Sequence, residues 1–174
     1  VSIFSLYVIL DLIIWATNKS HLVIFLWSTQ ILLEPFIFFC GLYVTYLFLE
    51  EANLFSLRKK IILAILLVPF VLLIPTKYDL LAVRVATCDA QENPFIIYYS
   101  YSLEILFALW ILVLSIKSYI KKTETNERQR VKFFVAGILL FLFAFSWGNI
   151  AGSFTEDWKL AQYGLFGMPI FMVF

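Results

Sequence analysis

Long apolar blocks alternate with short polar connections along this chain. Six such blocks cover residues 1–16, 22–49, 61–75, 95–116, 133–150 and 160–174. A backbone that crosses hydrocarbon must satisfy its own hydrogen bonds, so blocks of this length predict transmembrane helices. We therefore predict an all-α polytopic transmembrane helix bundle with six spans, forming a single domain over residues 1–174. The last block is shorter than the roughly 20 residues that span a bilayer, so we expect a truncated last span and a piece of a longer protein.

Composition agrees with a bilayer as the main solvent. Hydrophobic residues make up 63% of the sequence and charged residues 14%, against about 45–50% and about 25% in soluble domains. The net charge of +1 gives no reason to expect nucleic acid as a partner. Cys40 lies in an apolar block and Cys88 in a polar connection, so their depths argue against a disulfide. The sequence has no metal-ligand spacing, and we expect no metal and no cofactor.

Lysine and arginine are unevenly distributed over the five polar connections. The second and fourth connections, residues 50–60 and 117–132, hold nine of the thirteen. Lys and Arg near helix ends mark the cytoplasmic side of a membrane. Since successive connections lie on opposite faces, the first, third and fifth should lie outside. The last helix then emerges in the cytoplasm.

Three carboxylates lie within the predicted spans, namely Asp11, Glu34 and Glu104. At about 1.5 Å per residue, Glu34 and Glu104 lie roughly 13–18 Å below the outer ends of their helices, and Asp11 lies nearer the outer face. An ionised carboxylate at that depth costs several kcal/mol unless it is protonated, paired or hydrated. No Lys or Arg occurs at a matching depth in the sequence. We expect Glu34 and Glu104 to face the interior of the bundle.

These carboxylates have two interpretations. One is a polar-ligand or proton-sensitive site between helices. The other is structural, with each neutral carboxyl donating a single interhelical hydrogen bond. The polar residues that could complete either arrangement are Gln30, Asn149, Ser146 and Trp147. The sequence contains no nucleophile–base set and no phosphate-binding loop.

Other local features suggest shape and anchoring. Pro35 and Pro69 each lack an N–H donor and should kink their helices. Residues 80–87, LLAVRVAT, are β-prone and could form a small strand pair over the outer mouth of the bundle. Three tyrosines lie near the start of the fourth block, residues 95–116: Tyr98, Tyr99 and Tyr101. We expect this tyrosine cluster to lie at the headgroup level and to anchor the helix in the lipid.

Two segments carry a resemblance to a known family. They are LYVILDLIIWATNKSHLVIFLWS, residues 6–28, and NIAGSFTEDWKLAQYGLFGMPIF, residues 149–171. Both resemble the N-terminal seven-helix membrane region of bacterial sensor histidine kinases. The apolar run through Ile14-Trp15 before Asn18 matches the second helix of that family, and the long third connection with Cys88, followed by the tyrosine cluster and Glu104, also fits. The small residues at the start of the last helix complete the similarity: Gly164, Gly167, Met168 and Pro169.

The resemblance implies that this chain holds helices two to seven of a sensory module in the bacterial inner membrane. A fused cytoplasmic signalling domain would follow, and a homodimer stays open. The chain contains no phosphoacceptor-histidine helix and no ATP-binding domain, and its single histidine, His21, is predicted outside. The chain itself is therefore not expected to be an enzyme, whereas the longer protein would be a histidine kinase.

We interpret the chain as a signal-transducing module that couples a stimulus to that cytoplasmic domain. A signal requires two bundle arrangements that bind the stimulus unequally. The residues that could let the helices change arrangement are Pro35, Pro69, Gly164, Gly167 and Pro169. A solute or ion transporter and a passive membrane anchor remain as alternatives, because intramembrane acids and broken helices are also transporter features.

Overall fold

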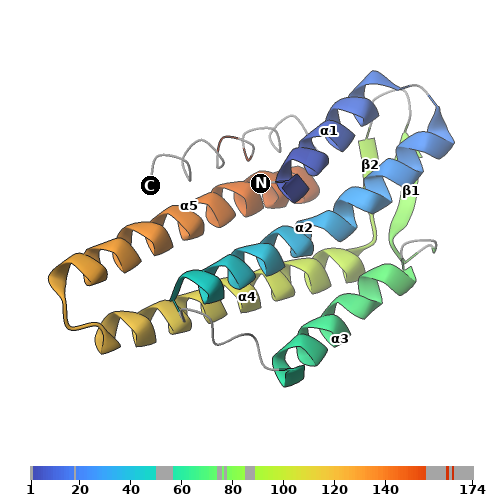
Figure 1. Ribbon diagram of the computed structural model, residues 1–174. Coiled ribbons are helices and arrows are strands. Elements are labelled where there is room, and N and C mark those ends of the chain that lie inside the picture. Colours follow the sequence, from blue (N-terminus) through green and yellow to red (C-terminus); the bar gives the residue numbers. More distant parts are fainter. Residues whose placement is uncertain are drawn as a thin grey trace.

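The computed structural model describes residues 2–17, 19–49, 57–73, 76, 78–84, 89–155, 164 and 166. Over these ranges the chain forms five helices and one antiparallel strand pair (Figure 1). In chain order the elements are α1 (Ser2–Ala16), α2 (Ser20–Leu49), α3 (Leu57–Leu73), β1 (Leu80–Arg84), β2 (Asp89–Glu92), α4 (Pro94–Lys121) and α5 (Thr125–Thr155). The predicted helical bundle is confirmed. The segment predicted to form a strand pair, residues 80–87, supplies the strand β1, and its partner β2 lies after that segment, at Asp89–Glu92.

The prediction of six spans is not supported. Within the described ranges, three helices are long and apolar enough to cross a membrane: α2, α4 and α5. Helix α1 has 15 residues, about 22 Å at 1.5 Å per residue, against a hydrocarbon core of about 30 Å. Helix α3 has 17 residues. The block at 160–174 lies outside the described residues except for Gly164 and Phe166.

Charged and polar residues account for the lengths of α3, α4 and α5 relative to their apolar blocks. The first turn of α3 carries Arg58, Lys59 and Lys60, so its apolar stretch is shorter than the helix itself. Helices α4 and α5 extend beyond their apolar blocks into polar sequence. At the start of α4, the Asn93 side chain accepts a hydrogen bond of 2.9 Å from the backbone N–H of Phe95. Pro94 then fills the first helical turn, where its missing N–H does no harm.

Helices α2, α4 and α5 run side by side, and α1 folds back along the first half of α2 (Figure 1). The β1–β2 hairpin also contacts α2 and lies at the end of the bundle that holds the α1–α2 turn. Helix α3 packs beside α2, and the Tyr99 hydroxyl on α4 donates a 2.7 Å hydrogen bond to the backbone oxygen of Leu66 on α3. We call the end with the hairpin the hairpin end, and the opposite one the basic end.

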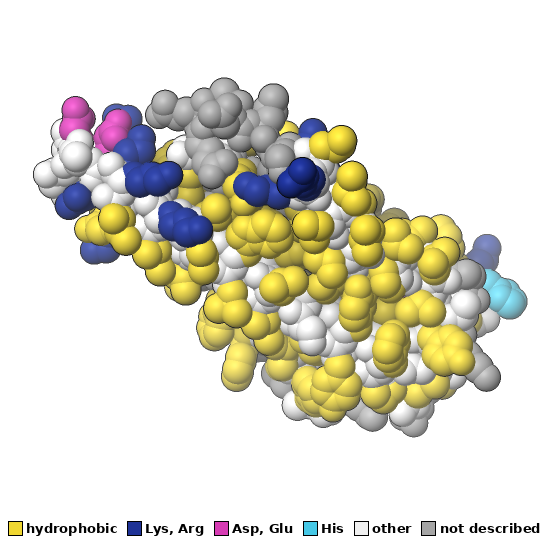
Figure 2. Space-filling view, turned by 90° about the horizontal axis from the view of Figure 1, so that it is seen from below, with side chains coloured by type: hydrophobic (Ala, Val, Ile, Leu, Met, Phe, Trp, Pro, Cys, Tyr) yellow, Lys and Arg dark blue, Asp and Glu magenta, His cyan; other side chains and the backbone are white. Residues whose placement is uncertain are grey.

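The basic end is where the cations gather. The residues concerned are Arg58, Lys59, Lys60, Lys117, Lys121, Lys122, Arg128, Arg130 and Lys132. Figure 2 shows Lys and Arg mostly over that half of the molecule, whereas the single histidine lies at the far end. Between the ends, large apolar side chains cover the surface; Phe25 and Phe143 are 64% and 67% exposed. A surface that is apolar around its middle suits lipid, and this chain is a helical membrane protein.

The core is aromatic where α1, α2 and α5 meet. Phe145 is 1% exposed. Its ring lies edge-on to Phe4 at 6.0 Å and to Tyr7 at 5.2 Å between centroids. Phe38 and Phe141 add further ring contacts at 6.4 Å. Edge-to-face pairs of this kind add packing energy beyond the area they bury, so Phe145 links three helices.

Small residues let the segment at Gly164 approach α5 closely. A Cβ built on Gly164 would lie 3.0 Å from the backbone oxygen of Phe145 and 3.4 Å from the Cα of Gly148. Ala144, Gly148 and Gly152 recur every four residues on α5, a spacing that allows close backbone contact in membranes. Of the predicted hinge residues, Gly164 is thus a packing contact, whereas Gly167 and Pro169 lie outside the described residues.

This contact predicts different outcomes for two added methyl groups. Gly164→Ala should lower the free energy of unfolding by about 1–3 kcal/mol, because backbone atoms cannot yield. Gly41→Ala on α2 meets the flexible ends of two side chains, Leu142 at 3.2 Å and Ile111 at 3.8 Å. It should change the free energy of unfolding by less than about 1 kcal/mol, because alanine also favours the helix. Titration with SDS in mixed micelles measures both. Equal losses in the two variants would contradict the close approach.

Candidate functional site

One buried and two partly buried carboxyl groups lie among the helices toward the hairpin end. They belong to Glu34 on α2, Glu92 on β2 and Glu104 on α4. We call these three residues the acidic cluster. Each accepts hydrogen bonds from side chains of other elements, and no ion pair joins any of them to a described Lys or Arg. Carboxyl groups held this way must be neutralised by protons or by a bound cation.

Glu104 is the most deeply buried member, at 1% exposure. The Ser146 hydroxyl on α5 donates a 2.7 Å hydrogen bond to its Oε2. The Ser100 hydroxyl, one turn earlier on α4, lies 3.4 Å from its Oε1. Glu104 therefore joins α4 to α5, and the expectation that it faces the interior is confirmed.

Glu34 joins α2 to α1 and α5 through a shared tyrosine. The Tyr7 hydroxyl lies 3.2 Å from Glu34 Oε1 and 3.3 Å from Asn149 Oδ1, so its single proton can serve either acceptor. Pro35 follows Glu34, and its missing N–H leaves a carbonyl of the preceding turn without its usual donor. Helix α2 continues through Pro35, and α3 continues through Pro69.

Glu92 was not among the residues that the sequence indicated. The hairpin carries it inward, where the indole Nε1 of Trp27 donates a 3.0 Å hydrogen bond to its Oε1. The Ser153 hydroxyl donates to its Oε2 at 3.2 Å, and the Tyr101 hydroxyl donates in turn to Ser153 at 2.8 Å. Burial, and to a smaller extent the nearby Asp79 carboxylate, raises the pKa of Glu92 to about 7, although the hydrogen bonds from Trp27 and Ser153 lower it in part.

Asp79, in the turn before β1, extends the acidic region toward the hairpin end. It is 1% exposed. Burial raises its pKa to about 6, although a hydrogen bond with Ser28 lowers it in part. Its Oδ2 has no hydrogen-bond partner among the described residues. Glu92 and Asp79 can therefore change protonation state near neutral pH.

One face of α5 contacts two members of the acidic cluster directly and the third through Tyr7. Ser146, Asn149 and Ser153 are spaced by three and four residues, which places them on one side of a helix. Ser146 binds Glu104, Ser153 binds Glu92, and Asn149 reaches Glu34 through Tyr7. Asn149 is 3% exposed, and its Nδ2 donors have no acceptor within the described part of the chain. This buried amide could donate to a bound polar group.

The remaining predicted site residues lie at the edge of the cluster or away from it. The Gln30 amide donates toward the backbone oxygen of Tyr7 at 3.4 Å and toward Asp11 Oδ1 at 3.5 Å. Asp11 is half-buried and contacts none of the three glutamates. Trp147 is 62% exposed and points out of the bundle. The predicted lipid-anchoring role fits Tyr98, which is 62% exposed, but Tyr99 and Tyr101 bond inward instead.

Glu92 was not predicted as a site residue because the sequence places it in a polar connection between two apolar blocks. Its position in the sequence could have indicated its place. Glu92 lies directly before the Asn93-Pro94 helix start and after a β-prone segment, and a strand pair at this point folds back over the end of the bundle. The described residues contain no group of three or more His, Cys, Asp or Glu side chains placed to hold a metal ion. The glutamates are thus linked by hydrogen bonds through α5 and do not form a ligand set.

No protein-family model, curated protein or solved structure matches this chain, so we infer its function from its own residues and geometry.

Proposed function

We propose that this chain is the sensory part of a bacterial membrane receptor, and that the acidic cluster responds to protons or to a small cationic ligand. The observation that carries the proposal is the α5 face of Ser146, Asn149 and Ser153. Ser146 and Ser153 on this face donate hydrogen bonds to Glu104 of α4 and Glu92 of β2, and Asn149 shares the Tyr7 hydroxyl with Glu34 of α2. A change of charge at the cluster therefore acts on α5 at three places.

The physics of the cluster supports two arrangements of the bundle. With all three carboxyl groups neutral, each hydrogen bond to α5 can persist. Ionising one group makes the next ionisation harder, because like charges repel strongly in a medium of low dielectric. A cation or proton that binds one arrangement better than the other shifts the populations by its difference in affinity. Helix α5 precedes the C-terminal segment, so its displacement is a route toward an output domain.

The orientation that we propose follows from charge. The basic end would face the cytoplasm, and the hairpin end with Glu92 and Asp79 would face outside. In this arrangement α1 and α3 also lie within the bilayer, and the block at 160–174 returns the chain to the cytoplasm as a sixth span. The resemblance of residues 6–28 and 149–171 to sensor histidine kinases supports a kinase domain as the output.

Neutral variants test the role of the carboxyl groups. Glu34→Gln and Glu104→Gln should each hold the output of the full-length receptor in its low-pH state, because glutamine mimics the protonated acid and keeps an oxygen that can accept the bond from Ser146 or Tyr7. The response to pH should fall by about 5- to 150-fold, in line with a coupling energy of about 1–3 kcal/mol. Autophosphorylation in proteoliposomes, recorded between pH 5 and pH 8, measures this.

Glu124→Gln is the matched control, because Glu124 is exposed at the α4–α5 turn and should leave the response unchanged. A wild-type response in both cluster variants, at normal membrane levels, would remove the acidic cluster from the mechanism.

A proton-coupled transporter is the second candidate function. Glu34, directly before Pro35 on α2, favours it, since ionisable groups within membrane helices line many transport pathways. Proteoliposomes separate the two functions. Acidification of the vesicle lumen that accompanies solute uptake, and that is lost in Glu104→Gln, would establish the transporter. Vesicles that take up neither protons nor solute but show pH-dependent phosphorylation would establish the receptor.

A further inference from the structure

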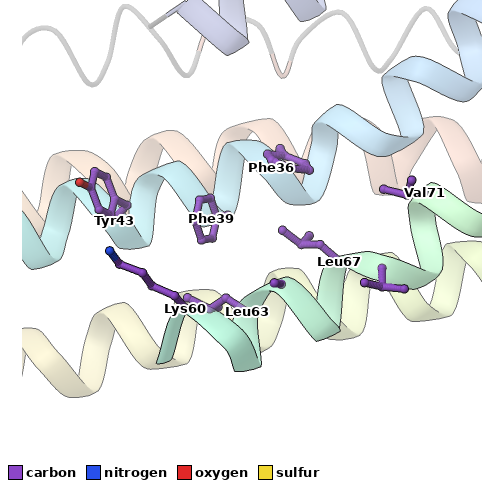
Figure 3. A pocket seen from close by; sticks show the side chains of 9 residues that line it. Phe36, Phe39, Tyr43, Lys60, Leu63, Leu67 and Val71 are labelled. Carbon is purple, nitrogen blue, oxygen red and sulfur yellow. The ribbon is translucent and has the colours of Figure 1, made fainter. Parts of the chain in front are cut away.

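A groove runs between α2 and α3 on the apolar surface of the bundle, away from the acidic cluster. Its volume is about 470 Å³, within the roughly 300–1,000 Å³ of small-molecule sites. The α2 side is formed by Phe36, Phe39 and Tyr43, and the α3 side by residues that include Lys60, Leu63 and Leu67 (Figure 3). Leu63 and Leu67 are buried and form the floor, whereas Ala64, Val68 and Val71 are exposed along the rim.

The groove is polar at one end only. Figure 3 shows the Lys60 side chain reaching across that end toward Tyr43. Lys60 is exposed and begins α3 together with Arg58 and Lys59. The Lys59 amine lies 4.6 Å above the Tyr46 ring, one turn beyond Tyr43 on α2. Lys60 is thus the one cation among the lining residues, with Arg58 and Lys59 nearby on α3, and the other lining residues are apolar or aromatic.

The length of the groove along α3 is close to the thickness of one leaflet of the bilayer. From Lys60 to Val71 the helix rises about 16 Å at 1.5 Å per residue. Half of a hydrocarbon core of about 30 Å is about 15 Å. Lys60 therefore falls at the headgroup level when Val71 lies near the bilayer midplane. A chain of methylene groups with an anionic head fits both the length and the charge of this groove.

We propose that the α2–α3 groove binds one anionic phospholipid of the leaflet at the basic end. One acyl chain lies over Leu63 and Leu67 between the aromatic rings of α2, and the phosphate contacts Lys60. This site is independent of the acidic cluster. A single Lys near a membrane surface attracts anionic lipid by about 1 kcal/mol, which corresponds to about fivefold preference over a zwitterionic lipid.

Lipid retention tests this site on the full chain. The protein in neutral detergent is mixed with phosphatidylglycerol or phosphatidylcholine of the same acyl chains, and retained lipid is counted by native mass spectrometry. We expect one retained lipid with about fivefold preference for phosphatidylglycerol, weakened in 1 M salt, where the Debye length falls to about 3 Å. Lys60→Gln should lose the preference, and Lys60→Arg should keep it. Lys132→Gln, an exposed cation on α5, should also keep it.

A bulky residue in the groove tests where the acyl chain lies. Ala64→Trp should abolish the retained lipid, whereas Ile65→Trp, at a neighbouring position that is 63% exposed and does not line the groove, should retain it. Val68→Trp replaces Ala64→Trp if that variant elutes as aggregate. Four results would each overturn the site. The first two are equal retention of the two lipids by the wild type and an unchanged preference in Lys60→Gln. The other two are retention of lipid in both groove-filling variants and a second copy of the chain bound in place of lipid.

Discussion

Phe145→Ala is expected to lower the free energy of unfolding by about 3 kcal/mol, at the lower end of the usual range for losing a buried phenylalanine. The ring of Phe145 packs against Phe4, Tyr7, Phe38 and Phe141, so its removal leaves a cavity where α1, α2 and α5 meet. Because lipid is as apolar as the core, the loss is mainly one of packing. SDS titration in mixed micelles at fixed detergent composition measures it.

Phe143 provides the matched control on the same helix. Its side chain is 67% exposed and faces the lipid, so Phe143→Ala should change the free energy of unfolding by less than about 1 kcal/mol. A loss in Phe143→Ala as large as that in Phe145→Ala would mean that this face of α5 does not point outward.

Glu92→Gln is expected to flatten the dependence of stability on pH. Burial raises the folded pKa of Glu92 from 4.5 to about 7, so the folded chain binds more protons than the unfolded chain between these values. The contribution of Glu92 to stability is therefore full below about pH 4.5 and is lost as the pH rises through about 7. At about 1.4 kcal/mol per pH unit, reduced for the partial exposure of the residue, the wild type should lose about 2–3 kcal/mol that the variant retains.

Unfolding midpoints at pH 5 and pH 8 measure this effect. Asp79, whose pKa burial raises to about 6, adds a second fall in the same direction, so some slope should remain until Asp79→Asn is combined with Glu92→Gln. Glu124→Gln, at the opposite end of the bundle, should keep the slope of the wild type. Identical slopes for Glu92→Gln and the wild type would show that Glu92 does not titrate in the folded chain within this range.

Helix positions followed closely from the apolar pattern, but helix lengths did not. The block at 22–49 became α2 (Ser20–Leu49) almost unchanged. The block at 133–150 became the much longer α5 (Thr125–Thr155), because its polar first turns are also helical. Hydropathy reports which residues avoid water, whereas the helix ends are set by caps and by neighbouring contacts such as the Arg128 side chain on the Lys122 oxygen at 2.6 Å.

The candidate site was predictable in part. Depth alone indicated Glu34 and Glu104, because a carboxylate within hydrocarbon has to face polar partners. Asn149 and Ser146 were predicted as neighbours; Ser146 donates a hydrogen bond to Glu104, and Asn149 accepts one from Tyr7, which also reaches Glu34. Glu92 and Tyr7 were not, since a hairpin that folds back over the bundle and a tyrosine that faces inward leave no periodic signal in an apolar sequence.

What the sequence determined by itself is the solvent, the helical class and the gathering of cations at one end, since these depend on composition and on local runs of residues. What only the tertiary structure decided is which side of each helix is inner. The helices are apolar on all sides, so no polar face marks the outside as it does in a soluble protein. The meeting of three glutamates on one face of α5 and the opening between α2 and α3 follow from how those faces pack, and packing is a property of the whole bundle.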